Sequence, residues 1–255
     1  MLEFSLNGKK YSISSDLHTH TMYSHGTGSI EDNVMAARLR NLKRIGISDH
    51  GFGHATYGMK RSDVPKMRAE IEKLKKKYND IEILMGIEAN ISNTSGLLDV
   101  RPEEFDEFDY VIAGIHYGAL GINKITGMSR SMSNLVNSHI KSEPGRKAIK
   151  RNTALVIKAI ERNPIAFLVH PGENAPIDLL EVALACANTG TLIEINTGHL
   201  TITADDIKTM ALADVKFIIN SDAHSPAHVG DFVASVQVAL EAGLDLSRIV
   251  NLEVY

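Results

Sequence analysis

Short apolar runs alternate with amphipathic segments along almost the whole chain. The runs are rich in Ile, Val and Leu and bounded by polar residues, a pattern that predicts buried β-strands. The seven expected strands are Ser15–His20, Arg44–Ser48, Ile81–Ile87, Tyr110–Ile115, Ile165–Val169, Leu192–Ile195 and Lys216–Ser221.

Between these runs, apolar residues recur at helical spacing. The clearest stripe consists of Val64, Met67, Ile71, Leu74 and Tyr78. Ser62 is the expected N-terminal cap of that helix. The other expected helices are Ile30–Asn41, Arg146–Arg162, Pro176–Asn188, a helix capped by Thr203 that runs through Ala213, and a last helix that carries Phe232 and Val236.

Strands that alternate with helices predict a parallel sheet, and 255 residues suit one closed α/β barrel. An open doubly wound sheet is the alternative. No Gly-x-Gly-x-x-Gly motif follows the first strand, which disfavours a dinucleotide-binding fold. We expect a single domain over residues 1–255, with a β-hairpin at residues 2–13 around Asn7-Gly8. The irregular stretch Tyr117–Gly145 is expected to be a loop that shapes specificity, with a short helix at Ser131–Ile140.

Composition excludes several classes of function. The net charge of −4 gives no sign of a nucleic-acid binder or a basic membrane surface. No run approaches the roughly 20 apolar residues of a membrane span, and no signal peptide opens the chain. The single cysteine, Cys186, excludes an intrachain disulfide and is expected to be buried. A cytoplasmic setting fits best, and the oligomeric state stays open.

The 11 histidines are unusually numerous, and their positions are informative. His18 and His20 are two residues apart, so their imidazoles point the same way if they lie in a strand. Metal-ligand residue types stand at six of the seven expected strand ends: His18/His20, His50, Glu88, His116, His170 and Asp222/His224. Because the strand ends of an α/β barrel share one face, these residues are expected to meet there.

A set rich in imidazole, with two carboxylates and no thiolate, favours Zn²⁺, with Mn²⁺ or Fe²⁺ as alternatives, over Mg²⁺ or Ca²⁺. Nine candidate ligands, counting His25 in the loop after the first strand, exceed the roughly four that one metal uses. At least two metal ions are therefore implied.

The motifs that carry these residues also resemble a known family. They are His18-x-His20, His25, Ser48-Asp49-His50-Gly51, Gly86-Ile87-Glu88, Gly114-Ile115-His116, Val169-His170-Pro171 and Ser221-Asp222-Ala223-His224. As an ordered set from Asp16 to about Phe232, they resemble the PHP (polymerase and histidinol phosphatase) family. The resemblance implies a distorted, TIM-like (β/α)7 barrel, a cluster of three divalent metal ions and hydrolysis of phosphate esters. The most similar branch is the stand-alone trinuclear-zinc phosphoesterases.

The resemblance also implies how the ligands are shared. His18, His20, Glu88 and Asp222 would hold one metal. Glu88 would bridge to a second metal, completed by His116 and His170. The third metal would be held by His25, His50 and His224. His25 depends most on the resemblance.

The expected reaction is attack of a metal-bound hydroxide on a small phosphomonoester, without a phospho-enzyme. Asp49 is a candidate leaving-group acid. Arg61 is the first choice for a phosphate contact, ahead of Lys60, Lys124 and Arg130, because its fork suits phosphate. Asn196 and His199 are candidates to bind substrate, and His54 to line the pocket mouth. The expected partner is a small phosphorylated substrate.

Three alternatives remain open from the sequence. A narrower activity is that of a histidinol-phosphate phosphatase. An amidohydrolase-type barrel also opens with His-x-His and ends with Asp, but does not use residues such as His25, His50 and His224. A non-catalytic metal-binding module is the third alternative.

Overall fold

Seven parallel strands form a nearly closed barrel in the computed structural model, which describes residues 2–92, 95–116, 119 and 143–255. Their order in the sheet follows the chain. The strands are β3 (Ser15–Asp16), β4 (Arg44–Ile47), β5 (Glu82–Asn90), β6 (Tyr110–Gly114), β7 (Ile165–Leu168), β8 (Leu192–Asn196) and β9 (Phe217–Asn220). A parallel bridge between Thr19 and Ala223 joins the two ends of the sheet. The predicted distorted (β/α)7 barrel is confirmed.

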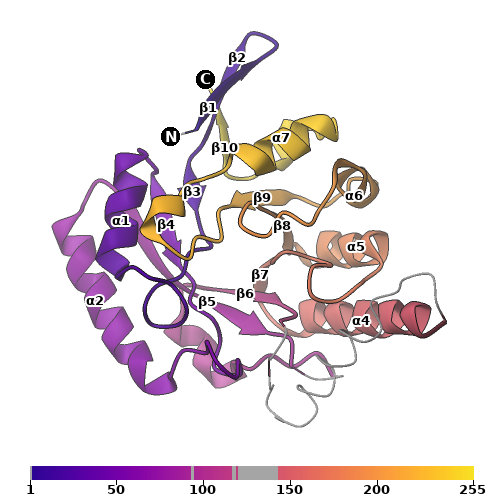
Figure 1. Cartoon of the computed structure of the whole chain (residues 1–255), viewed down its shortest axis with the longest axis horizontal. Coiled ribbons are helices and arrows are strands. Elements are labelled where there is room, and N and C mark those ends of the chain that lie inside the picture. Colours follow the sequence, from indigo (N-terminus) through magenta and orange to yellow (C-terminus); the bar gives the residue numbers. More distant parts are fainter. Residues whose placement is uncertain (1, 93–94, 117–118, 120–142) are drawn as a thin grey trace.

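The helices lie around the outside of the strands, with α1 and α2 on one side and α4 to α7 on the other (Figure 1). They are α1 (Ile30–Leu39), α2 (Val64–Lys77), α4 (Glu143–Arg162), α5 (Leu179–Thr189), α6 (Ala204–Met210) and α7 (Val233–Glu241). Capping boxes begin α1 at Ser29 and α6 at Thr203, where the cap side chain accepts from the third helical N–H.

The predicted start of α2 is wrong. Residues Arg61–Asp63 form a 3-10 turn, η1, and the N-cap of α2 is Asp63, without a side-chain capping bond. Pro65 near the start of the helix has no N–H to be capped, which reduces the need for a Ser62 cap. Four residues of the predicted apolar stripe, Val64, Met67, Ile71 and Leu74, are buried in α2, whereas Tyr78 is the C-cap and only partly buried.

A small second sheet lies at one end of the molecule. Strands β1 (Glu3–Leu6) and β2 (Lys9–Ile13) form an antiparallel hairpin, and the C-terminal β10 (Leu252–Val254) pairs with the other side of β2. The two chain ends therefore meet there, as Figure 1 shows. The sequence analysis did not predict β10.

Two strands differ in length from their predicted ranges. The first barrel strand is regular only over Ser15–Asp16, because Leu17 N donates to the Asn220 side-chain oxygen (2.9 Å). Strand β5 instead continues beyond Ile87 to Asn90. Glu88 is therefore inside a strand rather than at its end, and the expectation for that position is corrected.

The barrel interior changes character along its length. Near the amino ends of the strands it is apolar, with Ile112, Phe167 and Ile218 buried together. On β5, Glu88 and Asn90 are in phase with Leu84, which lies beside that cluster. Because alternate strand residues share a face, both polar side chains point into the lumen near the carboxyl ends.

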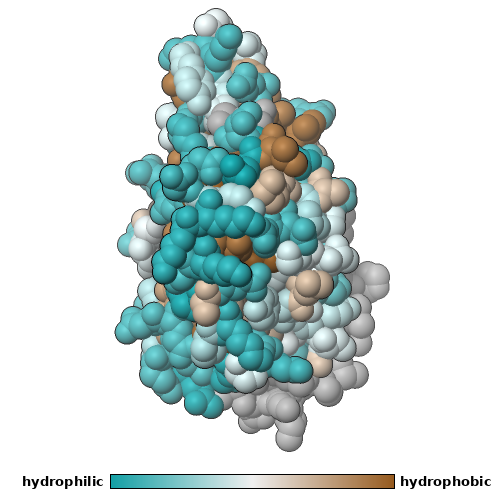
Figure 2. All heavy atoms as spheres, turned by 90° about the vertical axis from the view of Figure 1, so that its left-hand side faces the viewer, coloured by the Kyte–Doolittle hydropathy of each residue, from teal (hydrophilic) through white to brown (hydrophobic). Residues whose placement is uncertain are grey.

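Outside the barrel, the surface over α1 and α2 is mostly hydrophilic (Figure 2), and Cys186 is buried, as expected. No helix in the described part of the chain is long and apolar enough to cross a membrane. The predicted loop helix at Ser131–Ile140 and the candidate residues Lys124 and Arg130 lie outside the described residues.

One aromatic side chain fits against two glycines inside the barrel. Tyr110 is partly buried, and its hydroxyl donates to Leu17 O at 2.7 Å. A Cβ added at Gly46 or Gly86 would overlap the Tyr110 side chain. These glycines make room for the ring that fills the lumen below the polar layer.

We expect Gly86→Ala to lower the free energy of unfolding by about 1–3 kcal/mol, because the new methyl overpacks the Tyr110 ring. Urea unfolding measures this loss. The same substitution in a Tyr110→Ala background should cost clearly less. An equal cost in both backgrounds would contradict the proposed contact.

Candidate metal centre

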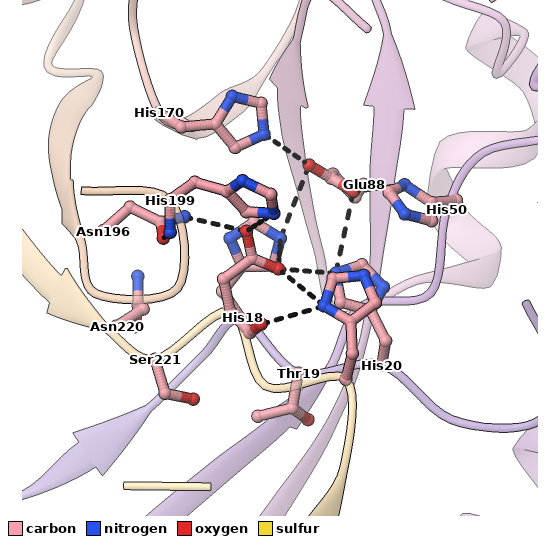
Figure 3. A network of polar contacts seen from close by, with 12 residues as sticks. His18, Thr19, His20, His50, Glu88, His170, Asn196, His199, Asn220 and Ser221 are labelled. Atoms are coloured by element: carbon pink, nitrogen blue, oxygen red, sulfur yellow. Dashed lines mark hydrogen bonds and ion pairs between the residues drawn. The ribbon is translucent and has the colours of Figure 1, made fainter. Parts of the chain in front are cut away.

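The nine predicted ligands gather at the carboxyl ends of the barrel strands. Figure 3 labels five of them, His18, His20, His50, Glu88 and His170, which point toward one another from four segments of the chain. The other four are His25, His116, Asp222 and His224, which lie among the same group of rings and carboxylates. Seven of the nine are buried, His224 is partly buried, and His25 is exposed.

Glu88 lies at the centre of this group. Its Oε2 is 2.5 Å from His50 Nδ1, and its Oε1 is 2.8 Å from His116 Nε2 and 3.1 Å from His170 Nε2. His18 Nε2 approaches Oε1 at 3.4 Å, and the Glu88 side chain is fully buried. A single carboxylate thus faces imidazoles from four other segments.

Asp222 provides the second carboxylate. Its Oδ1 lies 3.0 Å from His20 Nε2, 3.5 Å from His18 Nε2 and 3.6 Å from His224 Nδ1. Its Oδ2 accepts a hydrogen bond from Asn196 Nδ2 at 3.0 Å. One oxygen therefore faces the histidines, while the other is held by an amide.

Two buried ring nitrogens in the group, His18 Nε2 and His20 Nδ1, lack a hydrogen-bond partner among the described residues. Such atoms are costly in a protein interior unless a cation satisfies them. Potential ligand atoms also come within 4.8 Å of one another in three overlapping groups. The groups are His18/His20/Glu88, His50/Glu88/His116 and His20/His50/His224. This donor set fits divalent metal ions.

Electrostatics divides the imidazoles into two groups. Burial opposes their protonation, but the nearby carboxylates outweigh it and raise the pKa of His18, His50 and His170, whereas the neutral ring is favoured at other positions. Burial and neighbouring imidazoles lower the pKa of His20 well below its usual value, and burial is also the main cause of the lowered pKa of His25 and His224. Neutral imidazole is the form that binds a metal. Burial opposes the ionisation of Glu88, but His116, His50 and His18 outweigh it and hold the carboxyl pKa well below its usual value.

Three of the imidazoles have an acceptor next to Nδ1, which leaves Nε2 directed at the centre. His18 Nδ1 lies 2.8 Å from Glu194 Oε1, and His116 Nδ1 lies 2.7 Å from Asn90 Oδ1. His170 Nδ1 is 3.2 Å from Glu173 Oε2. An acceptor at Nδ1 selects the tautomer whose Nε2 lone pair is available.

The backbone is unusual at two of the ligand positions. His170 has a φ of 28° and Asp222 a φ of 54°, in the left-handed region that residues other than glycine rarely adopt. Strain of this kind persists only where the surroundings impose the conformation. Each residue lies two positions beyond the end of its strand, β7 or β9, where the chain turns to direct the side chain inward.

Asp49 anchors the loop that carries His25. Its carboxylate accepts from Thr21 N at 2.8 Å, Thr21 Oγ1 at 2.6 Å and Ser24 Oγ at 2.5 Å. Asp49 is fully buried, and burial raises its pKa. These contacts give the residue a loop-holding role, and its carboxylate is engaged away from the cavity.

A cavity of about 200 Å³ opens beside the cluster. It is lined by His25, His50, His54, Tyr57, His116, His170, Glu173, Asn174, His199, Asp222 and His224. The candidate residues His54 and His199 are both part of this lining. Asn196 lies behind the wall, where its Oδ1 accepts from His199 N at 2.8 Å.

Arg61 does not line this cavity. Its guanidinium pairs with Glu104 at 2.6 Å, donates to Asp99 O at 3.0 Å and stacks over Phe52 at 4.2 Å. The predicted phosphate contact would require Arg61 to leave these partners, so we do not retain it.

Sequence reasoning missed Glu173 and Asn90, which face Nδ1 of two candidate ligands. Glu173 follows His170 by three residues in a Pro-Gly turn, a spacing that could have indicated a contact. Asn90 follows Glu88 by two residues on β5 and therefore shares its inward face. Tyr57, which stacks on His25 with ring centroids 3.9 Å apart, had no distinguishing signal.

Comparison with known proteins agrees with this geometry. A family model described as PHP domain matches residues 16–170, and the chain belongs to that family. A curated relative named probable phosphatase from Clostridium acetobutylicum is 30% identical, over 88% of this chain and 83% of its own. Another of that name, from Shewanella halifaxensis, is 26% identical over 92% of this chain and 87% of its own.

Solved structures share the fold at low sequence identity. Histidinol phosphate phosphatase from Lactococcus lactis, complexed with zinc, L-histidinol and phosphate, superposes with a TM-score of 0.61 and 16% identity, covering 91% of this chain and 94% of its own. A chain in a structure of archaeal ribonuclease P with mature tRNA has a TM-score of 0.55 and 12% identity. The match covers 91% of this chain and 87% of that chain. At these identities the likeness concerns the fold alone.

We expect Asp49→Ala to loosen the His25 loop, because Thr21 and Ser24 lose their shared acceptor. Hydrogen exchange in peptides over residues 20–26 should become faster, with about 1–3 kcal/mol lost in stability. Asp80→Ala, which removes an exposed partner of Arg38, serves as the control. Loss of activity with unchanged exchange would instead favour an acid role for Asp49.

Proposed function

We propose that this chain hydrolyses small phosphomonoesters at a cluster of divalent metal ions. The observation that carries the proposal is the buried Glu88 carboxylate, with imidazole nitrogens of His50, His116 and His170 within 3.1 Å of its two oxygens. The two carboxylate oxygens can serve adjacent cations, which a neutral imidazole cannot do. The chain is a metal-dependent phosphatase of the PHP domain family, and its curated relatives are named probable phosphatases.

The nine residues divide into three proposed ligand sets around Glu88. His18, His20 and Asp222 complete the first set, and His116 and His170 complete the second. His25, His50 and His224 make the third. Three zinc ions are proposed, with manganese or iron as alternatives, because the set is dominated by imidazole.

Divalent ions bound here would lower the pKa of bound water toward neutrality and neutralise phosphate charge. The contribution of the chain itself is to hold the ligands rigidly. Glu194 accepts from His18 Nδ1 and from His170 N, and Asn196 donates to both Glu194 and Asp222. This connected layer of carboxylate and amide groups fixes the positions of the first and second ligand sets relative to each other.

His199 and Asn196 are the proposed link between the cluster and the substrate. The hydrogen bond from His199 Nδ1 to Glu173 Oε1, at 2.8 Å, raises the pKa of His199. A protonated ring would present Nε2–H from the cavity wall to a phosphate oxygen or to the leaving group. Asn196 positions this ring by accepting its backbone N–H.

The test measures phosphate release from a panel of phosphomonoesters together with the metal content of the protein. Histidinol phosphate belongs in the panel because the Lactococcus lactis structure holds L-histidinol and phosphate. We expect activity toward several small monoesters and about three metal equivalents per chain. Selective turnover of histidinol phosphate would indicate the narrower activity.

Within the same experiment, Glu88→Gln should lose metal and lower turnover more than about 100-fold, since loss of a residue that only supports a ligand already costs about 10–100-fold. Glu82→Gln is the matched control, because Glu82 lies at the other end of the same strand and pairs with Arg44 on the surface. One or two metals per chain would favour an amidohydrolase-type site. No phosphate release from metal-loaded protein would favour a non-catalytic module.

A further inference from the structure

Asp99 is a buried carboxylate outside both the ligand cluster and the cavity wall. It is 3% exposed and lies in the segment between β5 and the 3-10 turn η2 (Pro102–Glu107). Its Oδ1 accepts from Asn90 N at 2.8 Å, and its Oδ2 accepts from Asn90 Nδ2 and from Gly53 N, both at 2.6 Å. All three of these partners are N–H donors.

These contacts determine which way the Asn90 amide faces. An ionised carboxylate only accepts hydrogen bonds, so the NH₂ group of Asn90 must be the end that faces Asp99. The opposite end, Asn90 Oδ1, then faces His116 Nδ1 at 2.7 Å. Asn90 is fully buried, so solvent is not available to satisfy the reverse orientation.

The orientation of Asn90 in turn determines the tautomer of His116. An amide oxygen accepts but does not donate, so the proton of neutral His116 must be on Nδ1. The bare Nε2 lone pair then lies 2.8 Å from Glu88 Oε1 and 3.1 Å from His170 Nε2. A lone pair facing a carboxylate oxygen at this distance is repulsive unless a cation lies between them.

We propose that Asp99 is a positioning residue that acts through Asn90 to keep His116 in the Nδ1–H tautomer, with Nε2 free for a metal. Only the last step, that Nε2 is kept free for a metal, rests on the metal-dependent function proposed above. Asp99 also holds the segment after His50, because its Oδ2 accepts from Gly53 N; the segment passes so close that a Cβ at Gly51 would lie 2.6 Å from both carboxylate oxygens. One buried carboxylate thus contacts the segment that follows His50 and, through Asn90, orients His116.

Asp99→Asn is the informative substitution. An amide at position 99 can donate as well as accept, so Asn90 is free to turn its NH₂ toward His116. We expect His116 to shift toward the Nε2–H tautomer, visible in ¹⁵N-histidine NMR of the full-length protein before and after metal removal. Metal retention against a chelator should fall about 10- to 100-fold.

The charge-exchanged double variant, Asp99→Asn with Asn90→Asp, separates positioning from a merely structural role. The carboxylate at position 90 again accepts from His116 Nδ1, so the tautomer and metal retention should recover even if stability does not. Asn90→Leu removes the acceptor directly and should reproduce the tautomer shift if Asp99→Asn does not fold. Asp109→Asn is the matched control. The Asp109 carboxylate accepts a hydrogen bond from Met85 N, which lies on β5 like Asn90, but it has no contact with the ligand cluster.

The outcomes are distinct. A His116 signal in Asp99→Asn and Asn90→Leu that is unchanged from the Asp109→Asn control would overturn the proposal, as would a double variant that simply adds the two defects. The variant could show the tautomer shift while the wild-type protein neither binds metal nor releases phosphate. That result would support the role of Asp99 and reject the proposed function.

Discussion

The constraint on which the rest of the structure depends is that the Glu88 carboxylate must remain ionised deep inside the barrel. Glu88 is fully buried, and imidazoles from several strands surround its oxygens. Neither the carboxylate nor the histidines are favourable there alone, because burial penalises charge and mutual repulsion penalises protonated rings. Divalent cations between them would remove both penalties, and metal binding is therefore expected to be coupled to the stability of this end of the barrel.

The rest of the lumen is arranged around that requirement. Apolar side chains such as Phe167 line the opposite end, and the Tyr110 ring lies beneath the polar layer. Above it, Glu194 and Asn196 bind one another and hold His18 and Asp222. Because these groups satisfy one another, the polar layer can be buried without unpaired amides, and the ligands are held by contacts that do not involve the metal.

Much of this could be predicted from the sequence because strand ends are recognisable. Apolar runs followed by His or Asp gave the positions of His50, His170 and Asp222, and barrel topology predicted that they would meet. Glu88 was expected at a strand end because a charged residue usually stops an apolar run. In the barrel, Glu88 is instead inside β5 and in phase with Leu84, so its side chain points into the polar part of the lumen.

The parts that were missed are contacts between single polar side chains. Asn90, Asp99 and Glu173 carry no periodic signature, and their roles depend on distances between segments far apart in the chain. The contact of Arg61 with Glu104 is of the same kind, because the two residues lie 43 positions apart in the chain. Hydrophobic patterning predicts where strands end, but not which polar groups meet across the lumen.

Anomalous diffraction from crystals of the zinc-loaded protein tests the central claim most directly. The account predicts metal peaks on both sides of the Glu88 carboxylate, within bonding distance of its two oxygens and of the facing imidazole nitrogens, at about 2.0–2.2 Å. Peaks confined to surface histidines, with the Glu88 carboxylate contacting no metal, would contradict it.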